Sequence, residues 1–179
     1  MGQHSAAIAA PARRTRMYAE RLLVGVTPSI AARKPVFTKG GDTITIDANH
    51  AAFVLGHLAL YPSGVMRLIG REDLAAKLAM PADWEEKFKN GVQCVDDPSG
   101  TIYPAFDAIC AAYFRATDAM LDAVESMDDA ILLTPTAIES YAKMFPVTGA
   151  TLIFMLNNHT MMHLGQVSTW RRCMGLPPA

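Results

Sequence analysis

Apolar residues recur at spacings of three and four over residues 103–127, in the most regular amphipathic pattern of the chain. This spacing places them on one face of a helix, which can pack against neighbouring helices. Residues 5–27, 49–70 and 151–174 are also predicted to form long helices, from their apolar positions and helix-favouring composition. The stripe within residues 103–127 consists of Phe106, Ile109, Cys110, Tyr113, Thr117, Met120, Leu121 and Val124.

Prolines and short polar residues define the expected limits of these helices. Pro11 either starts the first helix within its first turn or kinks a longer one, and Pro28 closes it. Asp47 or Asn49 is expected to cap the start of the second helix. Pro62 lies inside the apolar stripe of that helix, so a kink or a short break is predicted there.

Two long connections separate the predicted helices. Residues 43–46 alternate polar and apolar side chains like a short strand. Because no partner strand is evident, residues 33–47 are interpreted as an extended crossover along the helices, with at most a brief β-bridge. Residues 71–103 are the least periodic part of the chain, and short helical turns are expected at residues 74–78 and 84–88.

A shorter helix is predicted within residues 132–146, where Thr136 and Glu139 are placed as a capping box. Four long amphipathic helices with lengthy connections predict an all-α fold, a four-helix bundle with crossovers and short extra helices. With 179 residues the chain is long enough for one domain with a full core. Residues 1–179 are therefore expected to form a single domain.

Composition and charge exclude several classes of protein. The chain is 51% hydrophobic and 18% charged, which is a globular composition. Its formal net charge is −1 with no dense block of Lys and Arg, which argues against nucleic acid as a partner. No segment approaches the roughly 20 apolar residues of a membrane span. The three cysteines are odd in number and far apart, so we expect a cytoplasmic protein without disulfides.

Two histidines in the predicted fourth helix are the strongest chemical signal in the chain. His159 and His163 are four residues apart, and on a helix such residues lie one above the other, with Cβ atoms about 5–6 Å apart. Neutral imidazoles at this spacing can bind one divalent metal ion. His57, on the apolar stripe of the second helix, offers a third ligand from another helix. The alternative, histidines that only form hydrogen bonds in the core, stays open.

Neighbouring residues refine this interpretation. His50 precedes His57 by about 10 Å along the helix axis, so the two cannot easily share one ion; we expect His50 to line the entrance. Thr160 stands where HExxH metalloproteases carry glutamate, which disfavours a zinc protease. Tyr61 and Tyr113 can project hydroxyls into a pocket, although buried tyrosines more often satisfy a backbone group. Three histidines would leave a coordination position open for water, substrate or a thiolate.

Three segments of the chain resemble the DinB-like (DinB/YfiT) superfamily of bacterial metalloproteins. Residues 49–58 carry a histidine directly after a glycine, and residues 158–166 carry HxxxH followed by Gly-Gln. The Arg-Arg-x-x-Gly-Leu-Pro-Pro ending, residues 171–178, is also similar to its members. The resemblance implies an up-down-down-up four-helix bundle that binds a divalent metal, nickel or zinc. The ligands that it implies are His57, His159 and His163.

The resemblance also implies a class of reaction. Better understood members are thiol S-transferases that use bacillithiol or a similar thiol, and a mycothiol-dependent isomerase; members are often homodimers. We therefore expect a metal-dependent enzyme that activates a low-molecular-weight thiol as co-substrate for attack on a small electrophile. A metal-dependent hydrolase and a non-catalytic metal-binding stress-response protein are the alternatives. No nucleic-acid or membrane partner is expected.

Overall fold

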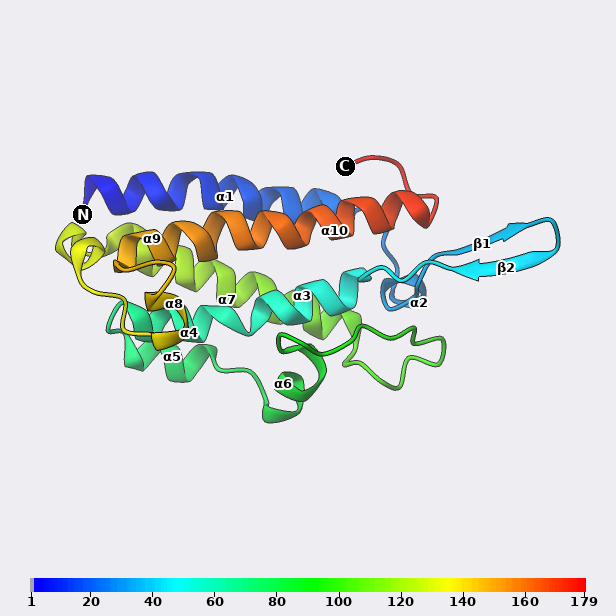
Figure 1. Ribbon diagram of the computed structural model, residues 1–179, viewed down its shortest axis with the longest axis horizontal. Coiled ribbons are helices and arrows are strands. Elements are labelled where there is room, and N and C mark those ends of the chain that lie inside the picture. The colour runs from blue at the N-terminus through cyan, green and yellow to red at the C-terminus, as the bar shows by residue number, and fades with distance from the viewer. Residues whose placement is uncertain (1) are drawn as a thin grey trace.

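Four helical segments lie side by side and make up most of the molecule (Figure 1). The computed structural model describes residues 2–179. In chain order, the segments are α1 (Gln3–Leu23), α3 (Ala51–Ala59) with α4 (Tyr61–Leu68), α7 (Phe106–Ser126), and α9 (Thr148–Ile153) with the π-helical turn η2 (Phe154–His159) and α10 (Thr160–Cys173). The predicted break near Pro62 is confirmed, because Leu60 separates α3 from α4.

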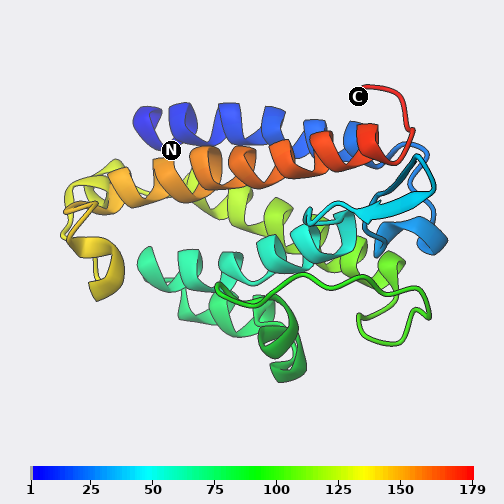
Figure 2. The ribbon, with the colours of Figure 1, turned by 45° about the vertical axis from the view of Figure 1, so that its right-hand side comes forward.

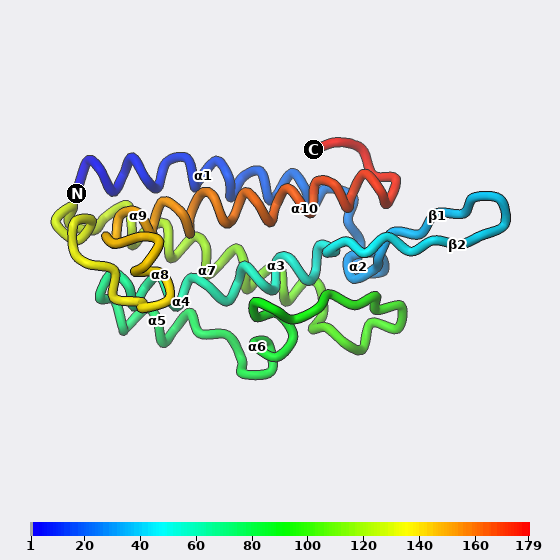
Figure 3. The backbone as a smooth tube through the Cα atoms, in the orientation of Figure 1, coloured from blue at the N-terminus to red at the C-terminus, as the bar shows by residue number. Residues whose placement is uncertain are grey.

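The segments are arranged as a ring of four. Helix α7 packs against α1 and α3, and α10 packs against the same two helices from the other side. The chain trace in Figure 3 shows that α1 and α10 run in one direction, whereas α3–α4 and α7 run in the other. Turning the molecule by 45° leaves the same neighbours in place (Figure 2). Each segment therefore buries its apolar face between two others.

Buried apolar side chains form two clusters, one toward each end of the four packed segments. The first cluster includes α3, the first half of α7 and the end of α10, where Trp170 is fully buried. The second cluster includes α4, the second half of α7 and the stretch from α9 to η2. Along the fourth segment, the second cluster ends at Leu156 and the first begins at Leu164. His159 and His163 lie in the interval between the two clusters.

The segment interpreted as an extended crossover is a β-hairpin, so that interpretation was wrong; the fold is mostly helical with one small two-stranded sheet. Strand β1 (Val36–Lys39) pairs with β2 (Asp42–Thr45) in an antiparallel register that places Phe37 opposite Ile44. The two-residue turn, Gly40-Gly41, has positive φ at both positions, which hairpin turns of this length favour and glycine adopts without strain. The hairpin projects beyond the helices (Figure 1).

Two predicted helix caps were also wrong. His50 caps α3 in place of Asp47 or Asn49, because its Nδ1 accepts a hydrogen bond from the Phe53 amide at 3.1 Å. Thr136 and Glu139 do not form a capping box, since the Thr136 hydroxyl instead donates to the Phe145 carbonyl at 2.6 Å.

The first helix and the connections differ from their predicted limits by a few residues. Pro11 lies inside α1, which begins at Gln3, and Pro28 starts a new short helix. The helical turns expected at residues 74–78 and 84–88 are confirmed. The remaining short helices are α2 (Pro28–Ala31), α5 (Glu72–Leu78), α6 (Ala82–Phe88), η1 (Asp129–Leu133) and α8 (Glu139–Ala142). Within residues 2–179, no helix combines the length and apolar character needed to span a membrane.

Candidate metal centre

His159 and His163 bring their rings together where η2 meets α10. His159 is the last residue of η2, and π-helical turns occur frequently at functional sites. The Nε2 atoms of the two histidines are 3.1 Å apart. Nitrogen ligands about 2.0–2.1 Å from a tetrahedral ion lie roughly 3.3 Å from one another. The separation is therefore that of two ligands of one ion.

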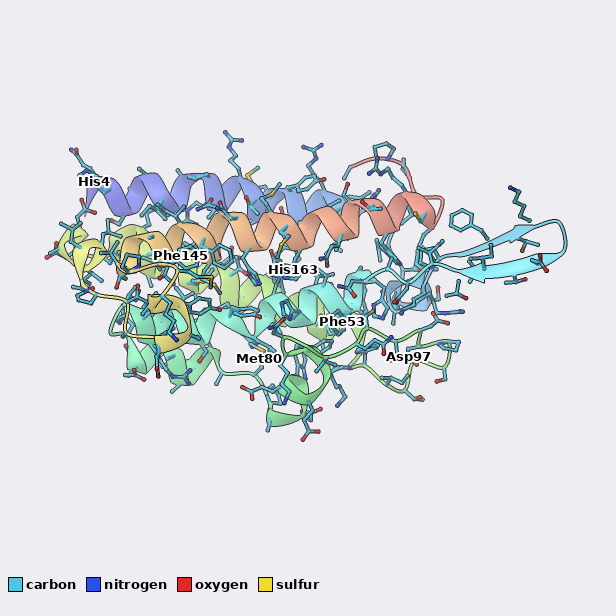
Figure 4. The ribbon with its side chains drawn as sticks, viewed as in Figure 1. His4, Phe53, Met80, Asp97, Phe145 and His163 are labelled. Atoms are coloured by element: carbon cyan, nitrogen blue, oxygen red, sulfur yellow. The ribbon has the colours of Figure 1, made fainter. Side chains whose placement is uncertain are left out.

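His57 joins the pair from α3. Its ring centroid lies 4.5 Å from that of His163 and 5.7 Å from that of His159. One ring nitrogen from each of the three histidines lies within 4.8 Å of the others, and this is the one cluster of three or more potential His, Cys, Asp or Glu ligands within residues 2–179. His163 lies between α10 and α3 (Figure 4). The structure thus brings all three sequence-predicted ligands to one point.

The main chain of α6 orients the His57 ring. His57 Nδ1 lies 2.6 Å from the carbonyl oxygen of Phe88. Because a carbonyl oxygen can only accept, Nδ1 carries the proton and donates it, so Nε2 keeps its lone pair for the centre. Gly56 permits this contact, since a Cβ atom there would lie 2.5 Å from the Phe88 ring. The Gly-His pair on α3 therefore serves both packing and ring orientation.

A pair of side-chain amides orients the His163 ring. His163 Nδ1 lies 3.3 Å from Gln166 Oε1, and Asn49 Nδ2 donates to the same oxygen at 3.1 Å. With the amide oxygen as acceptor, His163 Nδ1 is the donor and Nε2 is free to bind a metal. Partners of this kind fix the tautomer of ligating histidines and typically matter 10–100-fold for metal affinity.

Burial keeps the three imidazoles neutral at pH 7. It lowers the pKa of His57 and of His163, and together with the neighbouring histidines it lowers the pKa of His159 to about 4. No carboxylate is among the groups that shift these pKa values. Neutral imidazole is the form that ligates a metal, and such a donor set suits zinc, copper, iron or nickel. The residues therefore fit a divalent ion.

The hydroxyl of Tyr61 lies beside the centre. Its oxygen lies 3.2 Å from His57 Nε2, and its ring packs edge-on against His159 with centroids 4.7 Å apart. Burial is the main cause that raises the pKa of Tyr61 to about 12, so the hydroxyl is protonated at neutral pH. Tyr61 therefore presents a hydrogen-bond donor to the point where the Nε2 atoms meet, and does not satisfy a backbone group.

The remaining histidines lie elsewhere. His50 is fully buried and does not line an entrance, which corrects the expectation from the sequence. One ring nitrogen accepts from Phe53, and the other donates to the Val95 carbonyl at 3.0 Å, so both are used structurally. His4 is exposed at the start of α1 and contacts Asp129.

Sequence reasoning named Tyr61 and Tyr113 but missed the groups that orient the rings of His57 and His163. The amino-acid sequence gave no sign of the contact with the Phe88 carbonyl, because a main-chain atom is present at every residue whatever its side chain. Asn49 and Gln166 stand inside the two motifs that carry the family resemblance, and their position there was the available signal.

Fold and site together define a mostly helical protein with a group of three histidines, two buried and one half-buried, that is suited to a metal ion. The chain belongs to the DinB superfamily, whose family model matches residues 12–167. The matched region contains all three histidines together with Asn49, Tyr61 and Gln166. Comparisons with curated proteins and with solved structures gave no match.

Proposed function

We propose that the protein is a metal-dependent enzyme in which His57, His159 and His163 hold one divalent ion, nickel or zinc. The observation that carries the proposal is the convergence of three neutral imidazoles, two of which have their Nδ1 protons engaged by Phe88 and Gln166. In this proposal the four helical segments are the up-down-down-up bundle expected of the family. The reaction is attack by the sulfur of a low-molecular-weight thiol on a small electrophile: the thiol proton is released, a bond forms from sulfur to the electrophilic atom, and the leaving group departs from that atom with the electron pair of the broken bond.

An ion in this centre would supply Lewis acidity, favouring the thiolate form of a bound thiol. Tyr61 would complement that role as a protonated donor, because its hydroxyl lies within 3.2 Å of His57 Nε2. A hydroxyl in this position can orient an anionic sulfur by a hydrogen bond while keeping its own proton.

The electrophile would bind in a hollow of about 120 Å³ beside Tyr61. Its walls come from α4 and α8, from the residues Leu60 and Ile138 that precede these two helices, and from the fourth helical segment, and they include Tyr141 and Met155. Most of these side chains are apolar, although Arg67 also lines the hollow, so the hollow suits a small and largely apolar substrate.

A metal-dependent hydrolase is the second candidate, but the site favours thiol transfer. Activation of water is commonly assisted by a carboxylate or histidine that acts as general base. No Asp or Glu belongs to the group of potential ligands in residues 2–179, and the hydroxyl beside the centre belongs to Tyr61. With its pKa near 12, Tyr61 is a poor base at neutral pH.

Two experiments test the proposal. Metal analysis after reconstitution with nickel or zinc should give about one ion per chain, and His163→Ala should lose it. Wild-type protein that stays metal-free would overturn the metal centre. A panel of low-molecular-weight thiols with a generic electrophile then tests the reaction, and metal-loaded protein that turns over none of them would remove the transferase assignment.

A further inference from the structure

Two buried polar atoms in the middle of the molecule lack hydrogen-bond partners and belong to residues that line the same cavity. They are Nδ1 of His159 and the hydroxyl of Tyr113, which comes from α7. Both residues line a cavity of about 20 Å³ between α1, α3, α4, α7 and the fourth segment. Buried polar groups without partners are rare in folded proteins, so these two require an explanation.

The volume of the cavity limits which molecules can occupy it. A site needs at least about 10–15 Å³ of such space to hold a water molecule, together with two or more polar partners. The cavity meets the first condition but is far too small for an organic ligand. Tyr113 and His159 supply the polar partners, and the hydroxyl-bearing Thr117 and Thr160 line the same space.

The tautomer of His159 decides whether its Nδ1 atom donates or accepts a hydrogen bond. If Nε2 faces a metal ion, a neutral imidazole must carry its proton on Nδ1. His57 and His163 already donate their Nδ1 protons to Phe88 and Gln166. His159 is thus the one histidine of the three whose Nδ1 has no acceptor.

We infer that an ordered water molecule fills this cavity, accepts the proton of His159 Nδ1 and bridges it to the Tyr113 hydroxyl. Tyr113 is then a positioning residue of the metal centre, although it lies on a helix that supplies none of the ligands. The bridge completes a set in which each ligand is oriented by a separate part of the chain: α6 for His57, Gln166 for His163, and α7 for His159. This inference rests on the proposed metal-binding function.

The test compares Tyr113→Phe with wild-type protein and with Tyr18→Phe, which removes a hydroxyl from a partly buried tyrosine that packs in the first apolar cluster. Dissociation constants for zinc and nickel are measured by competition with a chromophoric chelator, and melting temperatures are measured without metal. Tyr113→Phe should weaken metal binding by about 10-fold or more. Its metal-free melting temperature should not fall, and Tyr18→Phe should bind metal like the wild type.

A crystal structure of the metal-loaded protein provides the second measurement. It should contain a water molecule within hydrogen-bond distance of His159 Nδ1 and the Tyr113 hydroxyl. Equal metal affinities of Tyr113→Phe and wild type would overturn the positioning role, and a dry cavity in the crystal would overturn the bridge. Wild-type protein that binds no metal would instead refute the proposed function and, with it, this inference.

Discussion

The ring of Phe88 lies against the backbone of Gly56, so that a Cβ atom at position 56 would be 2.5 Å from the ring. The next residue along α3 is His57, which donates to the carbonyl oxygen of Phe88 at 2.6 Å. Close packing at one residue and ring orientation at the next are therefore parts of one contact between α3 and α6. This contact makes the orientation of the His57 ring depend on a helix outside the ring of four segments.

Gly56→Ala is expected to weaken both folding and metal binding. Phe88 is fully buried, so the added methyl group displaces α6 and costs about 1–3 kcal/mol of unfolding free energy. The loss of an oriented His57 should lower metal affinity by about 10-fold. Gly64→Ala is the matched control, because its Cβ would meet nothing within 4 Å and should leave metal binding unchanged. Denaturant unfolding and chelator competition measure the two effects, and equal behaviour of the variants would contradict the prediction.

Gln166→Leu removes the acceptor for His163 Nδ1 while leaving a side chain of similar size. We expect metal affinity to fall by about 10–100-fold, because the ring loses the partner that fixes its tautomer. Asn49→Ala should have a smaller effect in the same direction, since Asn49 holds only the Gln166 amide. Isothermal titration with zinc separates the two variants. Full affinity in Gln166→Leu would show that His163 is oriented without the amide.

The sequence predicted that His159 and His163 would lie together, because their proximity depends on regular helical periodicity. The stripe over residues 103–127 corresponds to α7 at Phe106–Ser126, and the spacing of His159 and His163 brought their rings together. The two rings meet although His159 belongs to the π-helical turn before α10. The side-chain pattern did not reveal that turn.

What the sequence did not reveal depends on contacts between distant parts of the chain. The Phe88 carbonyl reaches His57 only because α6 folds back onto α3. His50 was assigned to an entrance, yet it caps α3 and is buried by the loop that carries Val95. The β-hairpin could have been predicted from the sequence, since Gly-Gly between two short segments is a hairpin signal.

Tyr61→Phe should separate metal binding from turnover. The variant keeps the aromatic ring against His159 but removes the hydroxyl beside His57 Nε2. Metal content should stay at about one ion per chain, whereas the turnover number with the best thiol and electrophile should fall by about 10–100-fold. Tyr18→Phe serves as control, because Tyr18 packs against the first apolar cluster and does not line the hollow beside Tyr61. Unchanged turnover in Tyr61→Phe would remove the hydroxyl from the mechanism.

The pH dependence of stability is expected to report on His50. Burial lowers the pKa of His50 to about 4 from an ordinary value of 6.5. The unfolded chain therefore takes up a proton below pH 6.5 that the folded protein refuses until about pH 4, so stability falls across this interval as pH decreases. A difference of this size corresponds to about 3 kcal/mol of unfolding free energy.

His50→Asn isolates this contribution to the pH dependence. Asparagine can cap α3 but does not titrate, so the variant should lose about 3 kcal/mol less than wild type between pH 7 and pH 4. The other histidines are present in both proteins, and their contributions cancel in the comparison. Urea unfolding of metal-free protein at several pH values gives both slopes. Parallel slopes would mean that His50 takes up its proton in the folded state as easily as in the unfolded chain, contrary to its burial against Phe53 and Val95.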